Sequence, residues 1–269
     1  NKLKKFPLAT KKERQKRHQK LYNSDPVLQI KKLSFSYQNN KILNSISFNL
    51  YKGETLGLVG ESGSGKSTIS KCILGINNHV EGEIIYNKKN INSITRKVFR
   101  KNVQLVFQDP YSSLNPEMKI GDSIIEPMNV HKILKKSERE SEAIKLLEDV
   151  GLKKEDFHKY PTQFSGGQRQ RIVIARALSI KPKIIICDES VSALDVSVQS
   201  QVLNLLNDLK DIYSITLLFI SHDLSVIKYM ADRLIVLKKG RIEEINETDS
   251  IFKNPKSTYT KHLLSSSGY

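Results

Sequence analysis

Gly60-Glu61-Ser62-Gly63-Ser64-Gly65-Lys66-Ser67 follows directly on the apolar run of residues 56–59 and precedes a stretch of helical character that extends to about Leu74. The spacing fits G-x-x-x-x-G-K-[ST], in the order strand, loop and helix that this motif requires. Glycines at these positions let successive backbone N–H groups turn inward around phosphate oxygens, and the helix N-terminus adds its dipole. The stretch therefore predicts a loop that binds nucleotide phosphates.

Three side chains at the end of this loop have predicted roles. We expect Lys66 to reach the β- and γ-phosphates, Ser67 to ligate Mg²⁺ and Thr68 to touch the α-phosphate. A glycine loop without a ligand is the alternative, and the strand and helix on either side of the loop disfavour it.

A phosphate loop of this kind needs an acidic partner for magnesium at the end of another buried strand. The apolar run of residues 184–187 ends in Asp188-Glu189. Asp188 fits the metal-coordinating role, and Glu189 is the candidate to orient and deprotonate the attacking water. Two acids after a strand can also be ordinary surface residues, and without the glycine loop that interpretation would be preferred.

A second glycine-rich helix start is Phe164-Ser165-Gly166-Gly167-Gln168-Arg169-Gln170-Arg171, with a helix expected over about residues 168–178. Backbone N–H groups and a helix N-terminus are again available to an anion. Here the chain resembles the ATP-binding cassette (ABC) ATPase family, whose signature Leu-Ser-Gly-Gly-Gln it matches except that Phe164 replaces the leucine. In that family Ser165, Gly166, Gly167 and Gln168 would contact the ATP held by a second subunit.

Other positions match the family one at a time. Tyr37, at the end of the first expected strand, resembles the aromatic residue that stacks on adenine, although an alternating strand aromatic is the alternative. Gln108 resembles the glutamine that senses magnesium. The segment Ser192-Ala193-Leu194-Asp195 is similar to the loop that communicates between paired subunits, and His222 resembles the histidine that contacts the γ-phosphate.

The strand and helix pattern agrees with an α/β fold. Residues 27–37 alternate apolar and polar, a second strand is expected over 46–50, and buried runs recur at 103–107, 184–187, 216–220 and 234–237. Residues 138–150 predict an amphipathic helix that is opened by a capping box of Ser137 and Glu140 and ended by Gly151. A short helix is expected over 258–264.

The resemblance implies a P-loop NTPase core of RecA-like type, α/β with a mostly parallel sheet, an antiparallel β subdomain and an inserted helical subdomain. It covers about residues 27–247. The expected organisation is a basic N-terminal extension over 1–26, an ABC nucleotide-binding domain over 27–250 with its helical insertion at about 109–165, and a C-terminal tail over 251–269.

Two further segments resemble the ATPases of oligopeptide, dipeptide and nickel importers. One is Gln108-Asp109-Pro110-Tyr111-Ser112-Ser113-Leu114-Asn115-Pro116, and the other is the tail over residues 254–264. In some members, carboxy-terminal cysteines hold an iron–sulfur cluster. Because this sequence has no cysteine after Cys187, no cluster is expected. The resemblance implies ATP and Mg²⁺ as cofactors, membrane permease subunits and a second ABC ATPase subunit as partners, and an extracellular solute-binding protein acting through the permease.

Charge and hydropathy limit the location and the partners. The net charge is +16, and residues 1–24 hold nine Lys or Arg against one Glu, a run that could meet nucleic acid, anionic lipid or an acidic partner, or simply be solvated. Neither a secretory signal nor a membrane span is expected, so we predict a cytoplasmic location. The resemblance to importer ATPases implies that this location is the cytoplasmic face of the membrane.

These features distinguish three possible functions. An importer motor is favoured over a soluble ABC ATPase that acts on ribosomes or DNA, because the chain has a single cassette and both importer-like segments, and no nucleic acid partner is expected. A non-catalytic binding module is disfavoured by the presence of Lys66, Asp188, Glu189 and His222. The transported solute, whether peptide, nickel or a metallophore, stays open.

Overall fold

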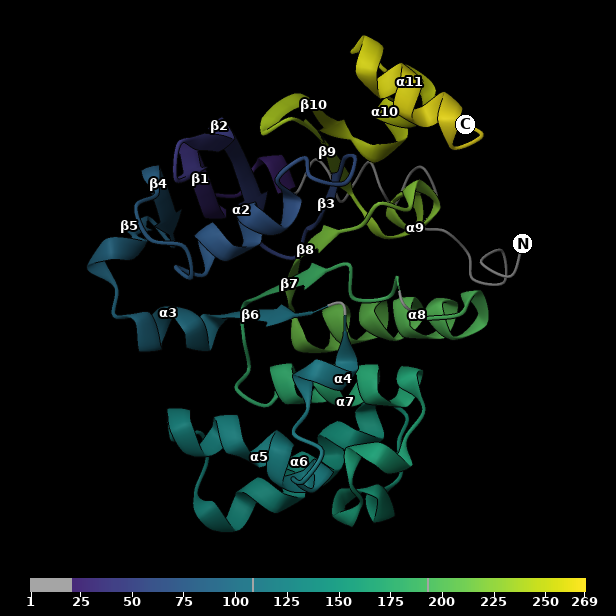
Figure 1. Cartoon of the computed structure of the whole chain (residues 1–269). Helices are drawn as coiled ribbons and strands as arrows, with labels where there is room; N and C mark the ends of the chain where they lie inside the picture. Colours follow the sequence, from purple (N-terminus) through teal and green to yellow (C-terminus); the bar gives the residue numbers. More distant parts are fainter. Residues whose placement is uncertain (1–20, 108, 193) are drawn as a thin grey trace. The chain divides into compact units, whose positions relative to one another are not determined.

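The computed structural model of the chain describes residues 21–107, 109–192 and 194–269. These residues form two compact units, whose helices and strands are labelled in Figure 1. The first unit contains residues 21–96 and 216–269, and the second contains residues 97–215.

An antiparallel sheet forms one layer of the first unit. Its strand order is β2-β1-β4-β5, with β1 over Pro26–Tyr37, β2 over Asn40–Tyr51, β4 over Glu81–Tyr86 and β5 over Lys89–Asn90. Leu28 of β1 lies opposite Leu50 of β2, and both are buried. β2 is longer than the predicted strand over 46–50, because it pairs with β1 from end to end. A 3₁₀ turn, η2 over Ile91–Ser93, follows β5.

The buried runs at 56–59, 216–220 and 234–237 are confirmed as strands of a second sheet in this unit. Their bounds are Thr55–Val59 for β3, Thr216–Ile220 for β8 and Arg233–Lys238 for β9, and β3 pairs in parallel with both others. β10, over Arg241–Glu247, pairs antiparallel with β9. β10 was not predicted from the sequence, because its side chains are mostly polar and part-exposed.

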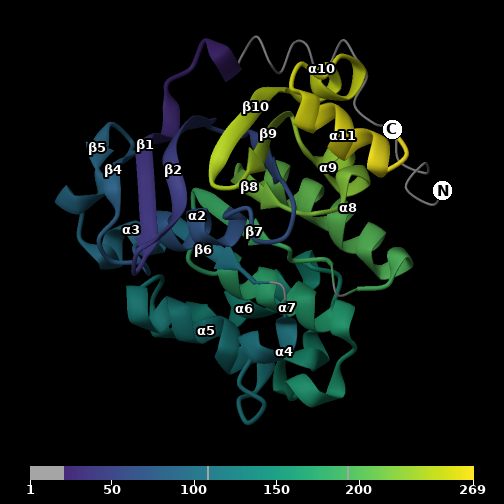
Figure 2. The same ribbon diagram turned by 45° about the horizontal axis from the view of Figure 1, so that its top comes forward.

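Several helices belong to the described residues of the first unit. They are α2 over Lys66–Ile73, α9 over Leu224–Met230, α10 over Thr248–Lys253 and α11 over Thr258–Ser266. α11 confirms the helix expected near the C-terminus. In both ribbon views, α10 and α11 lie beside β10 (Figures 1 and 2).

The second unit combines two parallel strands with several helices. The strands are β6 over Val103–Val106 and β7 over Ile184–Asp188. The helices are α3 over Arg96–Asn102, α4 over Pro110–Ser113, α5 over Ile120–His131, α6 over Lys136–Asp149, α7 over Gly166–Leu178 and α8 over Val196–Tyr213, with 3₁₀ turns η3 over Lys154–His158 and η4 over Pro161–Gln163.

The capping box predicted for α6 is wrong. The helix begins at Lys136, and the backbone N–H of Lys135 donates to Glu138 Oε2 at 2.9 Å. Ser137 and Glu140 therefore lie inside the helix. The predicted end is confirmed: the Gly151 N–H donates to Glu148 O at 2.9 Å, and Gly151 has the left-handed φ of +73° that favours glycine after a helix.

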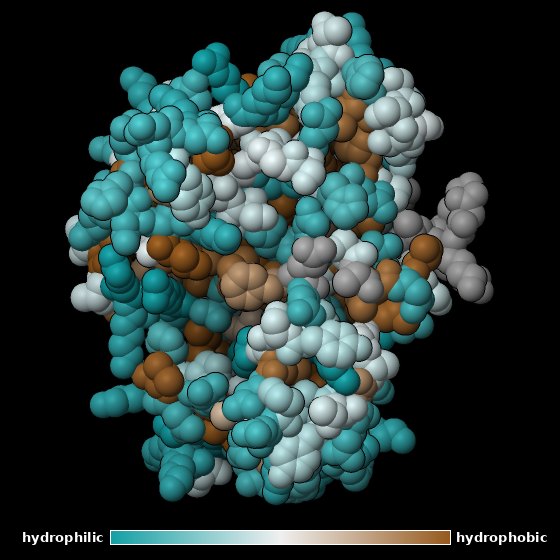
Figure 3. Space-filling view, in the orientation of Figure 1, coloured by the Kyte–Doolittle hydropathy of each residue, from teal (hydrophilic) through white to brown (hydrophobic). Residues whose placement is uncertain are grey.

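No helix in the described parts of the chain combines the length and the apolar character needed to cross a membrane. On the face shown in Figure 3 most residues are hydrophilic, and hydrophobic residues gather in small separate groups.

A buried ion pair joins the start of β3 to β9. Arg233 Nη1 donates to Glu54 Oε1 at 3.1 Å, and the Tyr51 N–H donates to Glu54 Oε2 at 2.8 Å. The Glu54 side chain is fully buried, and the Arg233 guanidinium lies 5.4 Å from the Tyr51 ring. Burial raises the pKa of Glu54 to about 7, although Arg233 acts in the opposite direction.

This pKa predicts how Glu54 changes stability with pH. The folded chain holds the Glu54 proton more tightly than the unfolded chain, whose carboxyl has a pKa of 4.5, so Glu54 makes the free energy of unfolding fall as pH rises between these two values. The substitution Glu54→Gln removes this titration. In denaturant titrations, the parent chain's free energy of unfolding relative to that of the variant should therefore decrease from about pH 4.5 to about pH 7.

Glu83→Gln, at an exposed position on β4, is the matched control for the loss of one carboxyl group. If the parent instead gained stability over Glu54→Gln as pH rose, Arg233 would hold the pKa of Glu54 below its usual range.

Candidate functional site

Two polar segments of the first unit leave its parallel sheet at one edge. Leu58 of β3 is in register with Ile220 of β8, and the Ser221 N–H donates to Leu58 O at 3.3 Å. Because parallel strands end on the same side of a sheet, the loop that begins at Gly60 and the segment that contains His222 start side by side. This edge is where ligands bind in open α/β sheets.

The loop from Gly60 to Ser67 is folded around the side chain of its own lysine. Lys66 is 6% exposed, and its Nζ donates to Gly60 O at 2.8 Å and to Glu61 O at 3.0 Å. α2 begins at Lys66, whereas Ser62, Gly63 and Ser67 are exposed. The ammonium group is thus held in place under a loop whose outer residues are exposed.

Close packing against the end of β9 fixes the shape of this loop. A Cβ added to Gly60 would lie 2.2 Å from the backbone oxygen of Leu237, so no larger residue fits there. On the other side, the Gly240 N–H, in the turn between β9 and β10, donates to Ser64 O at 2.9 Å. The phosphate loop is therefore supported by backbone from a distant part of the sequence.

Tyr37 and His222 are both exposed in the first unit. Tyr37 ends β1 as predicted, its hydroxyl donates to Asn77 Oδ1 at 3.3 Å, and its ring meets Phe35 edge-on with centroids 4.8 Å apart. Asn77 follows α2, and its side-chain amide reaches Cys72 Sγ on that helix at 3.5 Å. The ring of Tyr37 is consequently tied to the helix that starts at Lys66.

The acidic pair of the second unit stands at the end of a fully buried strand. Asp188 is the last residue of β7 and is 8% exposed. Glu189 has a left-handed φ of +50°, and its carbonyl oxygen accepts from the backbone N–H and the hydroxyl of Ser192 at 3.0 and 2.9 Å. A positive φ is uncommon for a residue other than glycine and concentrates at functional sites. Burial raises the pKa of the preceding Cys187 to about 12.

Ser165 and Gln168 form a capping box at the start of α7, which the sequence analysis did not identify. Gln168 N donates to Ser165 Oγ at 3.3 Å, and Ser165 N donates to Gln168 Oε1 at 2.9 Å. The S-x-x-Q spacing of these two residues in the sequence could have predicted the capping box.

The two glycines that follow Ser165 differ in their surroundings. A Cβ on Gly167 would lie 2.1 Å from Val198 Cγ1 of α8, whereas a Cβ on Gly166 would come no closer than 3.7 Å to Leu194. Gly167 is buried and Gly166 is partly exposed. Gly167 thus lets α7 approach α8, and Gly166 lies on the more open side of the helix start.

Asp195 is a further predicted position in the second unit. Asp195 caps α8 through Oδ1, which accepts from Ser197 N at 3.1 Å and Val198 N at 3.0 Å. Gln108 and Ala193 lie outside the described residues.

Two arginines of α7 hold α4, a connection that the sequence analysis missed. The Arg169 guanidinium lies 4.0 Å from the centroid of the Tyr111 ring, and its Nε donates to Phe164 O at 3.0 Å. Two turns further along α7, Arg176 Nη1 donates to Ser113 O at 2.5 Å. The residues at positions i and i+7 of a helix share one face, so α4 lies along a single face of α7.

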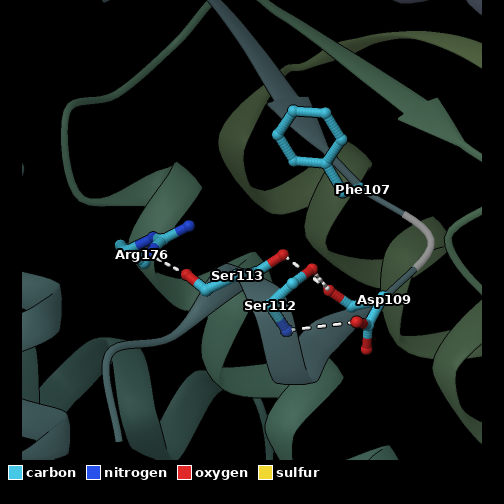
Figure 4. A pocket seen from close by; sticks show the side chains of 5 residues that line it. All are labelled: Phe107, Asp109, Ser112, Ser113 and Arg176. Atoms are coloured by element: carbon cyan, nitrogen blue, oxygen red, sulfur yellow. Dashed lines mark hydrogen bonds between the residues drawn. The ribbon is translucent and has the colours of Figure 1, made fainter. Parts of the chain in front are cut away.

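A pocket opens at this junction. Figure 4 shows its lining residues, Phe107, Asp109, Ser112, Ser113 and Arg176. Ser113 Oγ donates to Asp109 O at 2.8 Å, and Ser112 N donates to Asp109 Oδ2 at 3.2 Å. Phe107 is 46% exposed, so the pocket offers both an aromatic surface and polar groups.

Comparisons with known proteins show the family to which the chain belongs. A family model described as ABC transporter matches residues 43–192, more than half of the chain. The chain therefore belongs to the ABC transporter family, and it is an ATPase of P-loop NTPase fold, as its sequence predicts.

Individual relatives cover most of the chain. It is 49% identical over 230 residues to the oligopeptide transport ATP-binding protein OppF of Bacillus subtilis (strain 168), covering 84% of this chain and 75% of that protein. It is 46% identical over 252 residues to OppF of Streptococcus mutans, covering 90% and 82%. It is 45% identical over 256 residues to the glutathione import ATP-binding protein GsiA of Escherichia coli, covering 90% of this chain and 41% of GsiA.

Solved structures agree with this assignment. The cbiO1 protein of Clostridium perfringens, part of an ABC transporter complex, matches with a TM-score of 0.78 at 26% identity, covering 86% of this chain and 92% of that one. A dimeric ATP-binding cassette bound to ADP and Pi matches with a TM-score of 0.72 at 28% identity, covering 82% and 98%.

The different surroundings of the two glycines predict different costs of substitution. Gly167→Ala forces a methyl group into Val198 and should lower the free energy of unfolding by about 1–3 kcal/mol, the usual cost of overpacking. Gly166→Ala is the matched control and should change it by less than about 1 kcal/mol. Denaturant titration of both variants measures the difference; equal losses would show that α7 does not depend on this close approach.

Proposed function

We propose that the chain is the ATP-hydrolysing subunit of an ABC importer that energises uptake of oligopeptides or dipeptides, or of a related solute such as nickel or a metallophore, through a separate membrane permease. The observation that carries the proposal is 45–49% identity, over most of the chain, to proteins named for oligopeptide transport, peptide import and glutathione import. The importer-like segments at 108–116 and 254–264 support it. The working location is the cytoplasmic face of the membrane.

In this proposal the glycine loop of the first unit holds the triphosphate. The residues Gly60, Glu61, Ser62, Gly63, Ser64, Gly65, Lys66, Ser67 and Thr68 surround the phosphates, and the ammonium of Lys66 reaches the β- and γ-oxygens. Tyr37 stacks on adenine. The tight fit of Gly60 against Leu237 supports this assignment, because a larger residue at position 60 would push the loop out of shape.

The donor set also fits magnesium. The Ser67 hydroxyl, the Asp188 carboxylate and the Gln108 amide are oxygen ligands of the kind that Mg²⁺ prefers. The ion would neutralise charge on the phosphate oxygens during transfer. We assign ligation to these three residues, positioning of the attacking water to Glu189, and contact with the γ-phosphate to His222.

The signature residues are assigned to a second ABC ATPase subunit's nucleotide. Lys66 already serves one triphosphate, so Ser165, Gly166, Gly167 and Gln168 would have no phosphate to meet unless another chain supplied it. Two chains arranged head to tail solve this, with Asp195 near the junction between them. The dimeric cassette among the structural relatives supports such an assembly.

The junction of α4 and α7 is the proposed docking place of the permease. Its pocket combines the exposed ring of Phe107 with polar groups, and Tyr111 beside it is 60% exposed. Because Arg169 and Arg176 join α4 to the helix that starts with the signature, a permease element seated here would act on both together. The extracellular solute-binding protein would act through the permease.

The net charge of +16 favours one alternative, a soluble ABC ATPase that acts on ribosomes or DNA. Purification of the tagged chain from membranes separates the two functions. Permease subunits should co-purify with it, whereas co-purification of nucleic acid without membrane subunits would support the alternative.

The role of Glu189 is tested by Glu189→Gln, which keeps the shape of the side chain but removes the carboxylate. ATP should still bind, while hydrolysis by the complex assembled with its permease falls by about 10²-fold or more, the scale of general-base loss. Glu155→Gln is the control, because Glu155 is exposed on η3 of the same unit. Steady-state hydrolysis by Glu189→Gln near the parental rate would exclude Glu189 as the base.

The shared site is tested by mixing two variants. Lys66→Ala removes the ammonium from the phosphate loop and Ser165→Arg blocks the signature, so a mixed dimer carries one site with both halves intact and one with both lesions. Hydrolysis or ATP-dependent dimerisation of the mixture should exceed that of either variant alone. If the parent chain hydrolyses ATP at a rate per chain that does not depend on its concentration, the shared-site mechanism is wrong.

A further inference from the structure

The importer-like tail of the sequence folds into a helix, α11, and the buried carboxylate of Glu244 binds the backbone just before this helix. Glu244 of β10 is 8% exposed and accepts from Lys256 N and Ser257 N, each at 3.1 Å. Ser257 then caps α11, with its Oγ accepting from Tyr259 N at 3.2 Å. The start of α11, and Tyr259 with it, is therefore tied to β10.

Tyr259 points from this helix to the phosphate loop. Its hydroxyl oxygen accepts from Glu61 N at 3.4 Å, its ring is buried with 8% exposure, and Lys238 Nζ at the end of β9 lies 4.5 Å from the ring centroid. The contact joins residues that are 198 positions apart in the sequence. All these residues belong to the first unit.

The bonded N–H belongs to a particular peptide unit. The peptide between Gly60 and Glu61 presents its N–H to Tyr259 and its carbonyl oxygen to Lys66, whose Nζ donates to that oxygen at 2.8 Å. A peptide group is planar, so fixing the direction of its N–H also fixes the direction of its C=O. The orientation of the carbonyl that holds the lysine ammonium is thus set from both sides.

We propose that Tyr259 is a positioning residue for ATP binding: its hydroxyl fixes the Gly60–Glu61 peptide and so holds Lys66 ready for the β- and γ-phosphates. The inference rests on the proposed role of Lys66 in binding ATP. It gives the C-terminal helix of this chain a role at the nucleotide site.

Tyr259→Phe tests the proposal, because it removes only the hydroxyl and keeps the ring. The dissociation constant for Mg-ATP of the full chain should rise about 2- to 10-fold, the range for one lost neutral hydrogen bond. In the assembled complex, KM for ATP should rise by a similar factor while kcat changes less than about twofold, since the hydroxyl acts before the chemical step.

Tyr269→Phe is the matched control. Tyr269 lies in the same C-terminal segment, but its contacts with Phe252 and Lys228 are made by its ring. The affinity of the Tyr269→Phe chain for Mg-ATP should equal that of the parent chain. Parental affinity of Tyr259→Phe as well would overturn the proposal.

A double-mutant cycle separates positioning of Lys66 from a merely structural effect. If Tyr259 acts through Lys66, then Tyr259→Phe should not weaken nucleotide binding further in a chain that already carries Lys66→Ala. An equal loss with and without Lys66 would assign Tyr259 a general structural role and overturn the proposal.

A second variant, Ser257→Ala, tests the proposal if Tyr259→Phe folds poorly. Ser257→Ala loosens the start of α11 without touching the loop, and it should weaken Mg-ATP binding in the same direction and only while Lys66 is present; unchanged binding would count against the proposal. A parent chain that binds no Mg-ATP would reject the proposed function of the loop itself, which is a different result from parental affinity in the variants.

Discussion

The parallel pairing of β3 with β8 and β9 is the constraint on which the first unit depends. It brings the ends of strands far apart in the sequence to one edge, where the glycine loop, the segment with His222 and the backbone of Leu237 meet. Each supports the loop in a different way: β8 sets its starting point, the end of β9 limits the size of residue 60, and the turn after β9 bonds to Ser64. The position of Lys66 therefore depends on sheet register rather than on the loop alone.

In the second unit, helix packing rather than strand pairing fixes the position of a glycine-rich segment, the start of α7. α7 is held against α8 at Gly167, and its arginine face holds α4 at Tyr111 and Ser113. A helix that is fixed on two sides presents its first turn in a defined direction. The capping box of Ser165 and Gln168 further limits fraying of that turn, so the signature starts from an ordered helix end.

Much of the fold was predictable because its signals are local. Short apolar runs marked β3, β7 and β8 correctly, and the glycine after α6 marked its end. The start of α6 was not predictable, since Lys135 is an unusual capping residue. Ser137 and Glu140 fit the residue types of a capping box better than Lys135 and Glu138 do. β10 was missed because its alternation is mostly polar. The bonds from Tyr259 to the loop and from Arg169 to Tyr111 join segments whose proximity is set only by tertiary packing.

Each unit carries one cysteine, and both are almost fully buried: Cys72 lies on α2 of the first unit and Cys187 at the end of β7 in the second. Burial raises the pKa of both thiols, which keeps them protonated and poorly nucleophilic while the units stay closed. Alkylation of either sulfur therefore requires local opening of the surrounding structure. The chain thus contains an internal reporter for each unit, so the labelling rates of the two cysteines can follow separately how often the helix of the phosphate loop and the strand before Asp188 open.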